Sequence, residues 1–337
     1  MLRFADLFSG IGGFHLALQQ AADSGCELLG YSEIDPVCRE IYEQAFNVDK
    51  ATSNGDIRYL VNGKDGEWGM PQFDICFGGF PCQPFSNVGK RQGFSDDRSN
   101  VFFDLLRVIR YYRPSYFVLE NVEKIKTLEK GTILAMLVKE LKDLGYKVDI
   151  QLLCAKDYGL PHQRKRIFFC GRRQHKQKRF SDLPVPKPLS LEDSRYPSTW
   201  HLLERSMPAK HIVPIGSRKT IFTRNEKWMG DLEIDRAIAR PICATMGKWH
   251  RANQDNYYTE HYVMSDGGIK PKSFDYLRDT VRRLTPLEAL RLQGFPDSFE
   301  AHYISAGISP TPAYKTIGNA VPVDLAFAVI SNLLKQE

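Results

Sequence analysis

The stretch Phe77-Gly78-Gly79-Phe80-Pro81-Cys82-Gln83-Pro84-Phe85-Ser86 follows an apolar run, 73–77, that is typical of a buried strand. Two glycines end the run, and Cys82 stands between two prolines. Each proline fixes its own φ and favours extended backbone in the residue before it, so the loop is stiff. Open α/β sheets bind ligands at the carboxyl ends of their strands. An isolated cysteine is more often structural, but these neighbours favour a reactive thiol at Cys82.

The composition is that of a globular protein with room for two domains. The chain has 337 residues, of which 42% are hydrophobic and 26% charged. No apolar run approaches a membrane span, and residues 1–4 begin a strand-like segment rather than a signal peptide. Seven cysteines form no C-x-x-C pair, so no metal site is expected and the thiols are predicted to be reduced, as in cytoplasm. A net charge of +6 permits a polyanionic partner.

A glycine turn near the N-terminus indicates a nucleotide-binding type of sheet. Ser9-Gly10-Ile11-Gly12-Gly13 lies between a predicted strand, 3–8, and a predicted helix, 14–22. The next strand, 27–34, ends in Glu33-Ile34-Asp35, about twenty residues past the turn, where a carboxylate can reach ribose hydroxyls. The turn Asn54-Gly55-Asp56-Ile57 presents Asp56 near the same edge.

The glycine pattern narrows the ligand. A dinucleotide fingerprint needs G-x-G-x-x-G, but His15 stands where the last glycine would fall, and no triphosphate-binding loop is found. The turn therefore fits an adenosyl ligand without a phosphate, although such turns also occur without any ligand.

Further polar groups follow the later strands. A strand at 115–119 delivers Glu120-Asn121-Val122 to the same rim as Cys82, where the acid is either a cap or catalytic; alone, capping is favoured. Arg164 and Arg166, two apart in extended chain, share one face. They begin a segment, 164–179, with eight Lys or Arg and no acid, which is either a solvated face or a phosphate-tracking one. Strands at 147–155 and 166–171 are predicted to pair at the sheet edge.

The composition changes after the proline-rich linker 183–188. Residues 190–274 lack the βα rhythm and mix aromatic with Lys, Arg, Asn and Gln side chains, as in 248–251. Such side chains can read base edges or stack on bases, but a loop-rich β subdomain with incidental polar residues fits almost as well. Order returns with a capped helix start, Thr285 to Glu288, and a final amphipathic helix, 323–334.

Five motifs together carry a resemblance over nearly the whole chain. They are Asp6-Leu7-Phe8-Ser9-Gly10-Ile11-Gly12-Gly13, Phe80-Pro81-Cys82-Gln83, Glu120-Asn121-Val122, Arg164-x-Arg166 and Gly318-Asn319-Ala320-Val321. In this order they resemble the C5-cytosine-specific DNA methyltransferases of bacterial and phage type. The resemblance implies an α/β fold of the S-adenosylmethionine-dependent methyltransferases, a Rossmann-like mixed sheet of seven strands, with a smaller, loop-rich β target-recognition domain. It places the catalytic domain at 1–185 plus 315–337, target recognition at 190–280, and a return segment at 281–314.

The resemblance also implies the chemistry. A Cys82 thiolate adds to C6 of a cytosine flipped out of double-stranded DNA, which makes C5 reactive towards the methyl group of S-adenosylmethionine, with S-adenosylhomocysteine as the product. Glu120 would hydrogen-bond the cytosine N3 and amino group. Arg164 and Arg166 would contact the target nucleotide and lower the thiol pKa. The base that removes the C5 proton is not identified.

The remaining site residues are carried over by position. The cofactor contacts implied are Phe8, Gly10, Gly12, Glu33, Ile34, Asp56, Ile57, Asn319 and Val321. A lid, 83–100, is expected to close around the nucleotide. The DNA contacts expected are Ser86, Arg98, Lys248 and Arg251.

The chain departs from the family pattern at two positions. His162 occupies the place of a usual Gln, which puts one supporting hydrogen bond in doubt, and Ser32 stands where an amide residue is common. The expected enzyme is a monomeric, cytoplasmic, bacterial or phage-encoded DNA (cytosine-5-)-methyltransferase, with a separately acting restriction endonuclease as a partner and no membrane association.

Three other classes of protein are alternatives to this hypothesis. A tRNA cytosine methyltransferase would share the chemistry, but Phe80-Pro81-Cys82 in place of Pro-Pro-Cys and the long variable block favour DNA. A non-catalytic DNA-binding relative is opposed by the presence of Cys82, Glu120 and Arg164. A nicotinamide dehydrogenase conflicts with the glycine pattern.

Overall fold

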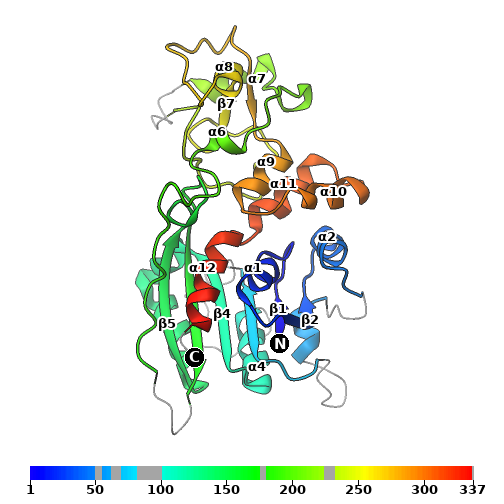
Figure 1. Ribbon diagram of the computed structural model, residues 1–337, viewed down its shortest axis with the longest axis vertical. Coiled ribbons are helices and arrows are strands. Elements are labelled where there is room, and N and C mark those ends of the chain that lie inside the picture. The colour runs from blue at the N-terminus through cyan, green and yellow to red at the C-terminus, as the bar shows by residue number, and fades with distance from the viewer. Residues whose placement is uncertain (50–54, 62–69, 82–100, 175–179, 224–231, 336–337) are drawn as a thin grey trace. The chain divides into compact units, whose positions relative to one another are not determined.

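The computed structural model describes the chain except for residues 50–54, 62–69, 82–100, 175–179, 224–231 and 336–337 (Figure 1). The described chain divides into two compact units. Unit 1 comprises 1–153, 165–187 and 325–337, and unit 2 comprises 154–164 and 188–324. The predicted domain boundaries, 1–185 plus 315–337, 190–280 and 281–314, stay a prediction.

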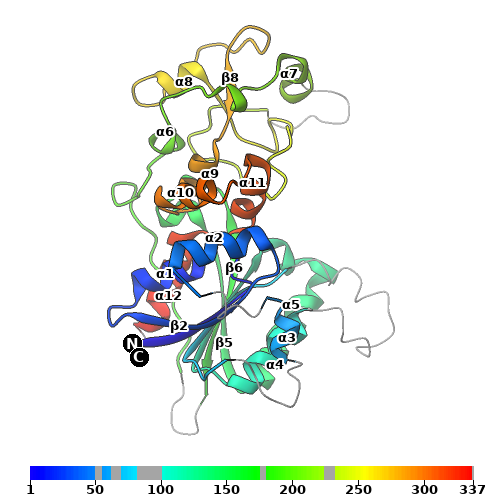
Figure 2. The ribbon, with the colours of Figure 1, turned by 90° about the vertical axis from the view of Figure 1, so that its right-hand side faces the viewer.

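Unit 1 is built on a mixed sheet with helices on both faces. Its elements are β1 (Leu2–Leu7), α1 (Gly13–Ala21), β2 (Cys26–Ser32), α2 (Pro36–Phe46), α3 (Ile57–Val61), β3 (Ile75–Gly79), α4 (Val101–Tyr112), β4 (Tyr116–Val122), η5 (Glu123–Lys126), η6 (Leu128–Gly131), α5 (Thr132–Asp143), β5 (Tyr146–Cys154) and β6 (Lys165–Arg173). Helix α12 (Val323–Leu334) begins at the end of unit 2 and continues into unit 1. In Figure 2, α3, α4 and α5 lie together on one face of the sheet, and α1 and α12 lie on the other.

The strand order explains how the site is assembled. It is β2-β1-β3-β4-β6-β5, with β1, β2, β3 and β4 parallel and β6 antiparallel to β4. The expected pairing of the two later strands at the sheet edge is confirmed, with β5 outermost. The described residues give six strands in this sheet, where the resemblance implied seven. Because neighbouring parallel strands end together, β1, β3 and β4 present their carboxyl ends at one rim.

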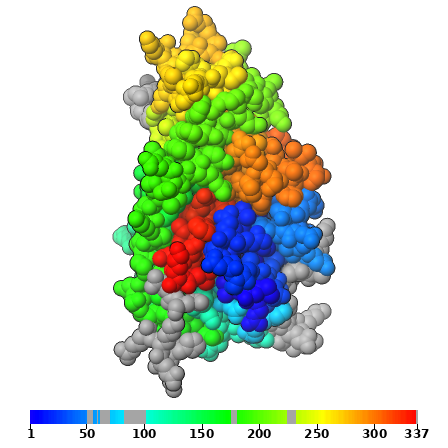
Figure 3. All heavy atoms as spheres, viewed as in Figure 1, coloured from blue at the N-terminus to red at the C-terminus, as the bar shows by residue number. Residues whose placement is uncertain are grey.

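The two faces of the sheet are closed by different helices. The larger core contains Phe102, Leu105 and Ile109 from α4, packed with Leu137 and Leu141 from α5. On the other face, the rings of Phe14 in α1 and Phe77 in β3 stack with centroids 5.2 Å apart. The C-terminal α12 lies beside the N-terminal segment on the surface of unit 1 (Figure 3).

Unit 2 has little sheet structure. Its elements are η7 (Ala155–Tyr158), α6 (Thr199–Leu202), η8 (Ala209–His211), α7 (Ile215–Phe222), β7 (Tyr257–Thr259), α8 (Glu260–Met264), β8 (Val281–Arg283), α9 (Pro286–Leu292), α10 (Ser298–Ser305) and α11 (Pro310–Asn319). Strands β7 and β8 form an antiparallel pair, and most of the rest is loop. The predicted helix start is confirmed: Thr285 caps α9, Pro286 is its first residue, and Glu288 completes a capping box.

Within the described residues, one apolar stretch is long enough to cross a membrane by length and composition alone, so the expectation that no apolar run approaches a membrane span is wrong on that criterion. It is Pro310–Leu334, and 56% of its apolar window is buried inside the protein. The stretch divides into α11 and α12, with Pro322 between them. Core helices show the same pattern.

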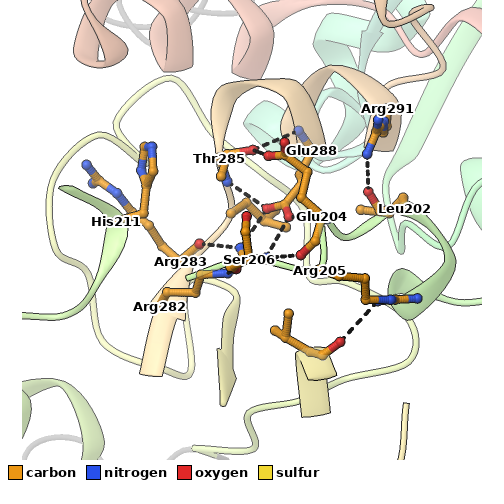
Figure 4. Close-up of polar contacts among 12 residues, drawn as sticks. Leu202, Glu204, Arg205, Ser206, His211, Arg282, Arg283, Thr285, Glu288 and Arg291 are labelled. Atoms are coloured by element: carbon orange, nitrogen blue, oxygen red, sulfur yellow. Dashed lines mark hydrogen bonds and ion pairs between the residues drawn. The ribbon is translucent and has the colours of Figure 1, made fainter. Parts of the chain in front are cut away.

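A buried ion pair in unit 2 connects segments that are far apart in the sequence (Figure 4). Arg282 and Glu288, both fully buried, meet with two N–H···O bonds of 2.7 Å. The three remaining N–H groups of Arg282 donate to the carbonyls of Ser206, Glu204 and Arg283. The Glu288 carboxylate also accepts from the amides of Glu204 and Thr285. All five guanidinium donors are therefore satisfied, as a buried charge requires.

We expect Arg282→Met to lower the free energy of unfolding by about 3–5 kcal/mol, because it leaves Glu288 charged and unpaired in the interior. The matched control is Arg278→Met, since Arg278 pairs with Asp275 but its side chain is 83% exposed and should matter little. Chemical denaturation of both variants measures the difference. Equal losses in the two variants would contradict a structural role for the buried pair.

Candidate active site

The glycine turn after β1 has left-handed backbone at Phe8, Gly10 and Gly12, with φ of 52°, 55° and 91°. A Cβ on Gly12 would lie 2.2 Å from the Phe46 ring, whereas nothing lies within 4 Å of a Cβ on Gly10. Gly12 is therefore required both for its backbone conformation and for space. Gly10 leaves an open surface at the rim of the sheet.

A chain of polar side chains, buried except at its exposed end, Gln19, lies behind this turn. Gln19 lies 3.3 Å from Nε2 of His15, whose Nδ1 lies 2.9 Å from the Tyr42 hydroxyl, which in turn donates to Asp6 at 3.3 Å. Burial lowers the pKa of His15 to about 3, and burial raises the pKa of Asp6 well above its usual value. The His15 ring also stacks on Phe46, with centroids 3.8 Å apart. Thus the residue in place of the third glycine supports the turn from behind.

Glu33 lies at the end of β2, beside the turn. One carboxylate oxygen accepts from the Gly10 amide at 2.9 Å, and the other accepts from the Asp35 amide at 2.8 Å. Burial raises the pKa of Glu33, while these amides oppose the shift. Each oxygen keeps a second lone pair for another donor. The next residue, Ile34, is 68% exposed and offers an apolar surface at the same edge.

The turn that contains Asp56, a further predicted cofactor contact, is hydrogen-bonded to the end of β2. The Ser32 hydroxyl donates to the Gly55 carbonyl at 2.9 Å, which places the turn containing Asp56 beside the strand end. The Asp56 carboxylate binds Arg58, which lowers its pKa. The Ile57 side chain is 2% exposed and belongs to the core. Ser32, noted from sequence only as a departure, is thus a residue that positions the site.

The loop that carries the predicted nucleophile starts from an anchored point. Phe80 is buried beyond the end of β3, and its carbonyl accepts from the Asn121 side chain at 2.9 Å. Gly79 of β3 lies opposite Glu120 of β4. Cys82, Ser86 and Arg98 lie outside the described residues. Asn121 was not singled out from sequence, because an amide that binds a distant carbonyl leaves no pattern.

A close ion pair lies at the carboxyl end of β4. The Nε of Arg166 is 2.6 Å from a Glu120 oxygen, and both side chains are only 11–12% exposed. Arg166 belongs to β6, where it lies opposite Val122 of β4. Burial lowers the pKa of Arg166, and Glu120 opposes the shift. The structure therefore brings together the predicted Glu120 and Arg166 at the strand end where Gly79, the residue before the anchored Phe80, lies opposite Glu120.

Arg164 has different surroundings from Arg166. Its side chain is in unit 2, is 2% exposed, and donates to the carbonyls of Ile242, Gly318 and Ala320 at 2.8–3.0 Å. His162, the other departure from the family pattern, is fully buried and accepts from the Ile242 amide at 3.2 Å. An imidazole therefore makes a buried hydrogen bond at this position.

The other predicted contacts in unit 2 range from buried to exposed. Asn319 is exposed within an otherwise buried stretch, 316–323, and Val321 is 9% exposed. Lys248 is exposed, whereas Arg251 is half-buried and donates to the Thr223 carbonyl at 3.0 Å.

We expect Gly12→Ala to cost about 2–5 kcal/mol of unfolding free energy, from the left-handed backbone and the overlap with Phe46. Gly10→Ala is the control, since it shares the backbone strain but meets no neighbour, and should cost about 1–2 kcal/mol. Denaturant titration of the ligand-free proteins gives both values. The packing explanation fails if the two losses are the same.

Comparison with known proteins agrees with this geometry. The profile of the C-5 cytosine-specific DNA methylase family matches residues 2–335. The chain is 32% identical to the Type II methyltransferase M.HhaI of Haemophilus parahaemolyticus over 98% of this chain and 94% of that one. It is 35% identical to M.NgoBI of Neisseria gonorrhoeae, over 96% and 90%. It is 33% identical to M1.ScrFI of Lactococcus lactis subsp. cremoris, over 99% and 78%.

Solved structures confirm the expected fold. The S. pombe Dnmt2 methyltransferase superposes with a TM-score of 0.77 at 23% identity, over 99% of each chain. The Entamoeba histolytica methyltransferase EhMeth gives a TM-score of 0.74 at 16% identity, over 99% of this chain and 98% of that one. At these identities the likeness concerns the fold alone. With the family profile spanning nearly all of its length, the chain belongs to the C-5 cytosine-specific DNA methylase family.

Proposed function

We propose that this enzyme methylates C5 of a cytosine in a specific double-stranded DNA sequence, through a covalent bond between Cys82 and C6 of the base. The observation that carries the proposal is the Glu120–Arg166 pair at the end of β4, next to the anchored residue Phe80. A carboxylate and a guanidinium at this rim can bind both polar edges of a pyrimidine ring. Cys82 lies two residues past this anchor in the sequence.

The roles of the side chains follow from the electron movements. Addition of the Cys82 thiolate to C6 pushes the C5–C6 π electrons into the ring and makes C5 nucleophilic. Glu120 would bind N3 and the amino group, where the ring gains charge and a proton. Arg166, which keeps Glu120 oriented, would bind the nucleotide. Loss of the C5 proton after methylation restores the C5–C6 double bond, and the C6–S bond breaks to release the thiolate.

The residues at the ends of β1 and β2 fit S-adenosylmethionine, which supplies the electrophilic methyl group and leaves as S-adenosylhomocysteine. Glu33 has lone pairs for the ribose hydroxyls beyond those used by two amides. Ile34 is exposed and can pack on adenine. Gly10 leaves room for the methionine part. We assign further cofactor contacts, on the family pattern, to Phe8, Gly12, Asp56, Ile57, Asn319 and Val321.

DNA binding is proposed to involve both described and undescribed segments. The target base must leave the duplex, at a cost of a few kcal/mol, because C6 is inaccessible inside the stack. Ser86 and Arg98, in the predicted lid, would contact the extruded nucleotide. Lys248 and Arg251 would contact the duplex, and Lys248 is exposed for this role. The relatives are named Type II methyltransferases, so we further propose a monomer that acts in the bacterial cytoplasm alongside a separate restriction endonuclease.

We expect duplex DNA containing 5-fluorocytosine to trap the enzyme in the presence of S-adenosylmethionine, because fluorine cannot leave C5 as a proton does. Mass spectrometry should locate the adduct at Cys82, and Cys82→Ala should abolish it. An adduct that persists in Cys82→Ala would refute this assignment. Trapping on a tRNA that contains 5-fluorocytosine, instead of on the duplex, would favour the RNA alternative.

We expect Glu120→Gln to lower kcat by about a hundredfold or more, because the amide cannot stabilise the charge that develops on the ring. Glu123→Gln is the matched control, since Glu123 lies on the same segment and only approaches Lys165, at 3.6 Å. Single-turnover transfer of labelled methyl groups to DNA measures both. A normal rate in Glu120→Gln would exclude a role in the chemical step.

A further inference from the structure

Arg164 joins two segments that lie far apart in the sequence. One guanidinium nitrogen donates to the Ile242 carbonyl at 2.8 Å, and the other donates to the Gly318 and Ala320 carbonyls at 2.9 and 3.0 Å. The arginine is 2% exposed, and all four residues belong to unit 2. Buried carbonyls need donors, so these bonds fix both segments relative to the same side chain.

The first segment, 242–251, which we call the reading segment, carries the exposed Lys248. It is held at its start by a second bond, from the Ile242 amide to His162 Nε2. Farther along, Arg283 donates to the Gly247 carbonyl at 2.7 Å, and its guanidinium lies 4.1 Å from the Trp249 ring centroid. The reading segment is therefore held at its start and at the two residues that flank Lys248. The Lys248 side chain itself is exposed to solvent.

The second segment, 317–320, which we call the Asn319 turn, ends α11. Gln293, fully buried, donates to the carbonyls of Ile317 and Ala320 at 2.8 and 3.0 Å. These bonds keep the turn buried on both sides of the exposed Asn319. A Cβ on Gly318 would lie 2.4 Å from the Cys243 carbonyl carbon, so the backbones of the two segments are in direct contact.

We infer that Arg164 is a positioning residue that fixes the reading segment and the Asn319 turn against each other, rather than a contact to the extruded base. The inference rests on the proposed function, which assigns the reading segment to DNA and the Asn319 turn to the cofactor. Movement of the guanidinium towards a nucleotide would leave three buried carbonyls without this donor. Because one side chain holds both segments, its loss affects sequence discrimination and cofactor affinity together.

Three sets of variants distinguish the effect of the bonds to the reading segment from the effect of the bonds to the Asn319 turn. Arg164→Met removes the donors to both segments, and Arg164→Lys restores a charged donor without the planar fork. His162→Leu removes a bond to the reading segment only, and His162→Gln restores the family side chain. Gln293→Leu removes bonds to the Asn319 turn only. Gly318→Ala, with Arg164 intact, forces the two backbones apart and replaces Arg164→Met if that variant does not fold.

Two measurements are needed on each purified variant. Titration calorimetry with S-adenosylhomocysteine, without DNA, gives cofactor affinity. Bisulfite sequencing of a plasmid methylated in vitro gives the ratio of methylation at the preferred sequence to that at sequences differing by one base. We expect Arg164→Met to weaken both by roughly tenfold, equivalent to about 1.4 kcal/mol each, with partial recovery in Arg164→Lys. His162→Leu should lower only discrimination, and Gln293→Leu only cofactor affinity.

A different pattern of losses would contradict a positioning role for Arg164. If Arg164→Met and Arg164→Lys keep wild-type affinity and discrimination but lose kcat and the 5-fluorocytosine adduct, Arg164 contacts the base and the inference is wrong. If the wild-type enzyme methylates no plasmid cytosine, the proposed function itself fails.

Discussion

Main-chain carbonyls without strand partners are the constraint on which unit 2 depends. Its one described sheet has two short strands, so most of its carbonyls cannot be satisfied by a ladder. Buried arginines supply the donors instead: Arg164, Arg218, Arg282 and Arg283, each at most 8% exposed, donate to carbonyls from distant loops. A rigid fork with five donors suits this task better than a flexible ammonium group. Arginine in this unit therefore has a structural role.

Unit 1 reaches the same precision by ordinary strand pairing. The parallel register sets Gly79 opposite Glu120, and the antiparallel β6 sets Arg166 opposite Val122. The carboxylate and its guanidinium partner are thus delivered by regular hydrogen bonding, without help from long loops. Asn121, next to Glu120, ties the exit of β3 to the same strand end.

Local patterns in the sequence were sufficient to predict most of this architecture. Apolar runs ended by glycine or proline gave the strands and helices of unit 1, and Thr285 with Glu288 gave the capped start of α9. The position of Glu120 near the carboxyl end of a strand was predicted from the sequence, whereas its ion pair with Arg166 was not. What the sequence could not give was the set of partners of Arg164 and Arg282, because their acceptors are main-chain atoms many residues away. A side chain that binds a carbonyl does not depend on the identity of the residue that bears it, so no motif records it.

Because such bonds do not depend on the identity of the residue that bears the carbonyl, they have an evolutionary consequence for the chain between residues 206 and 282. The Arg282 guanidinium donates hydrogen bonds to the carbonyls of Glu204 and Ser206, and these bonds do not require particular side chains at those two positions. The chain between residues 206 and 282 can therefore change in length or be exchanged by recombination while these bonds remain.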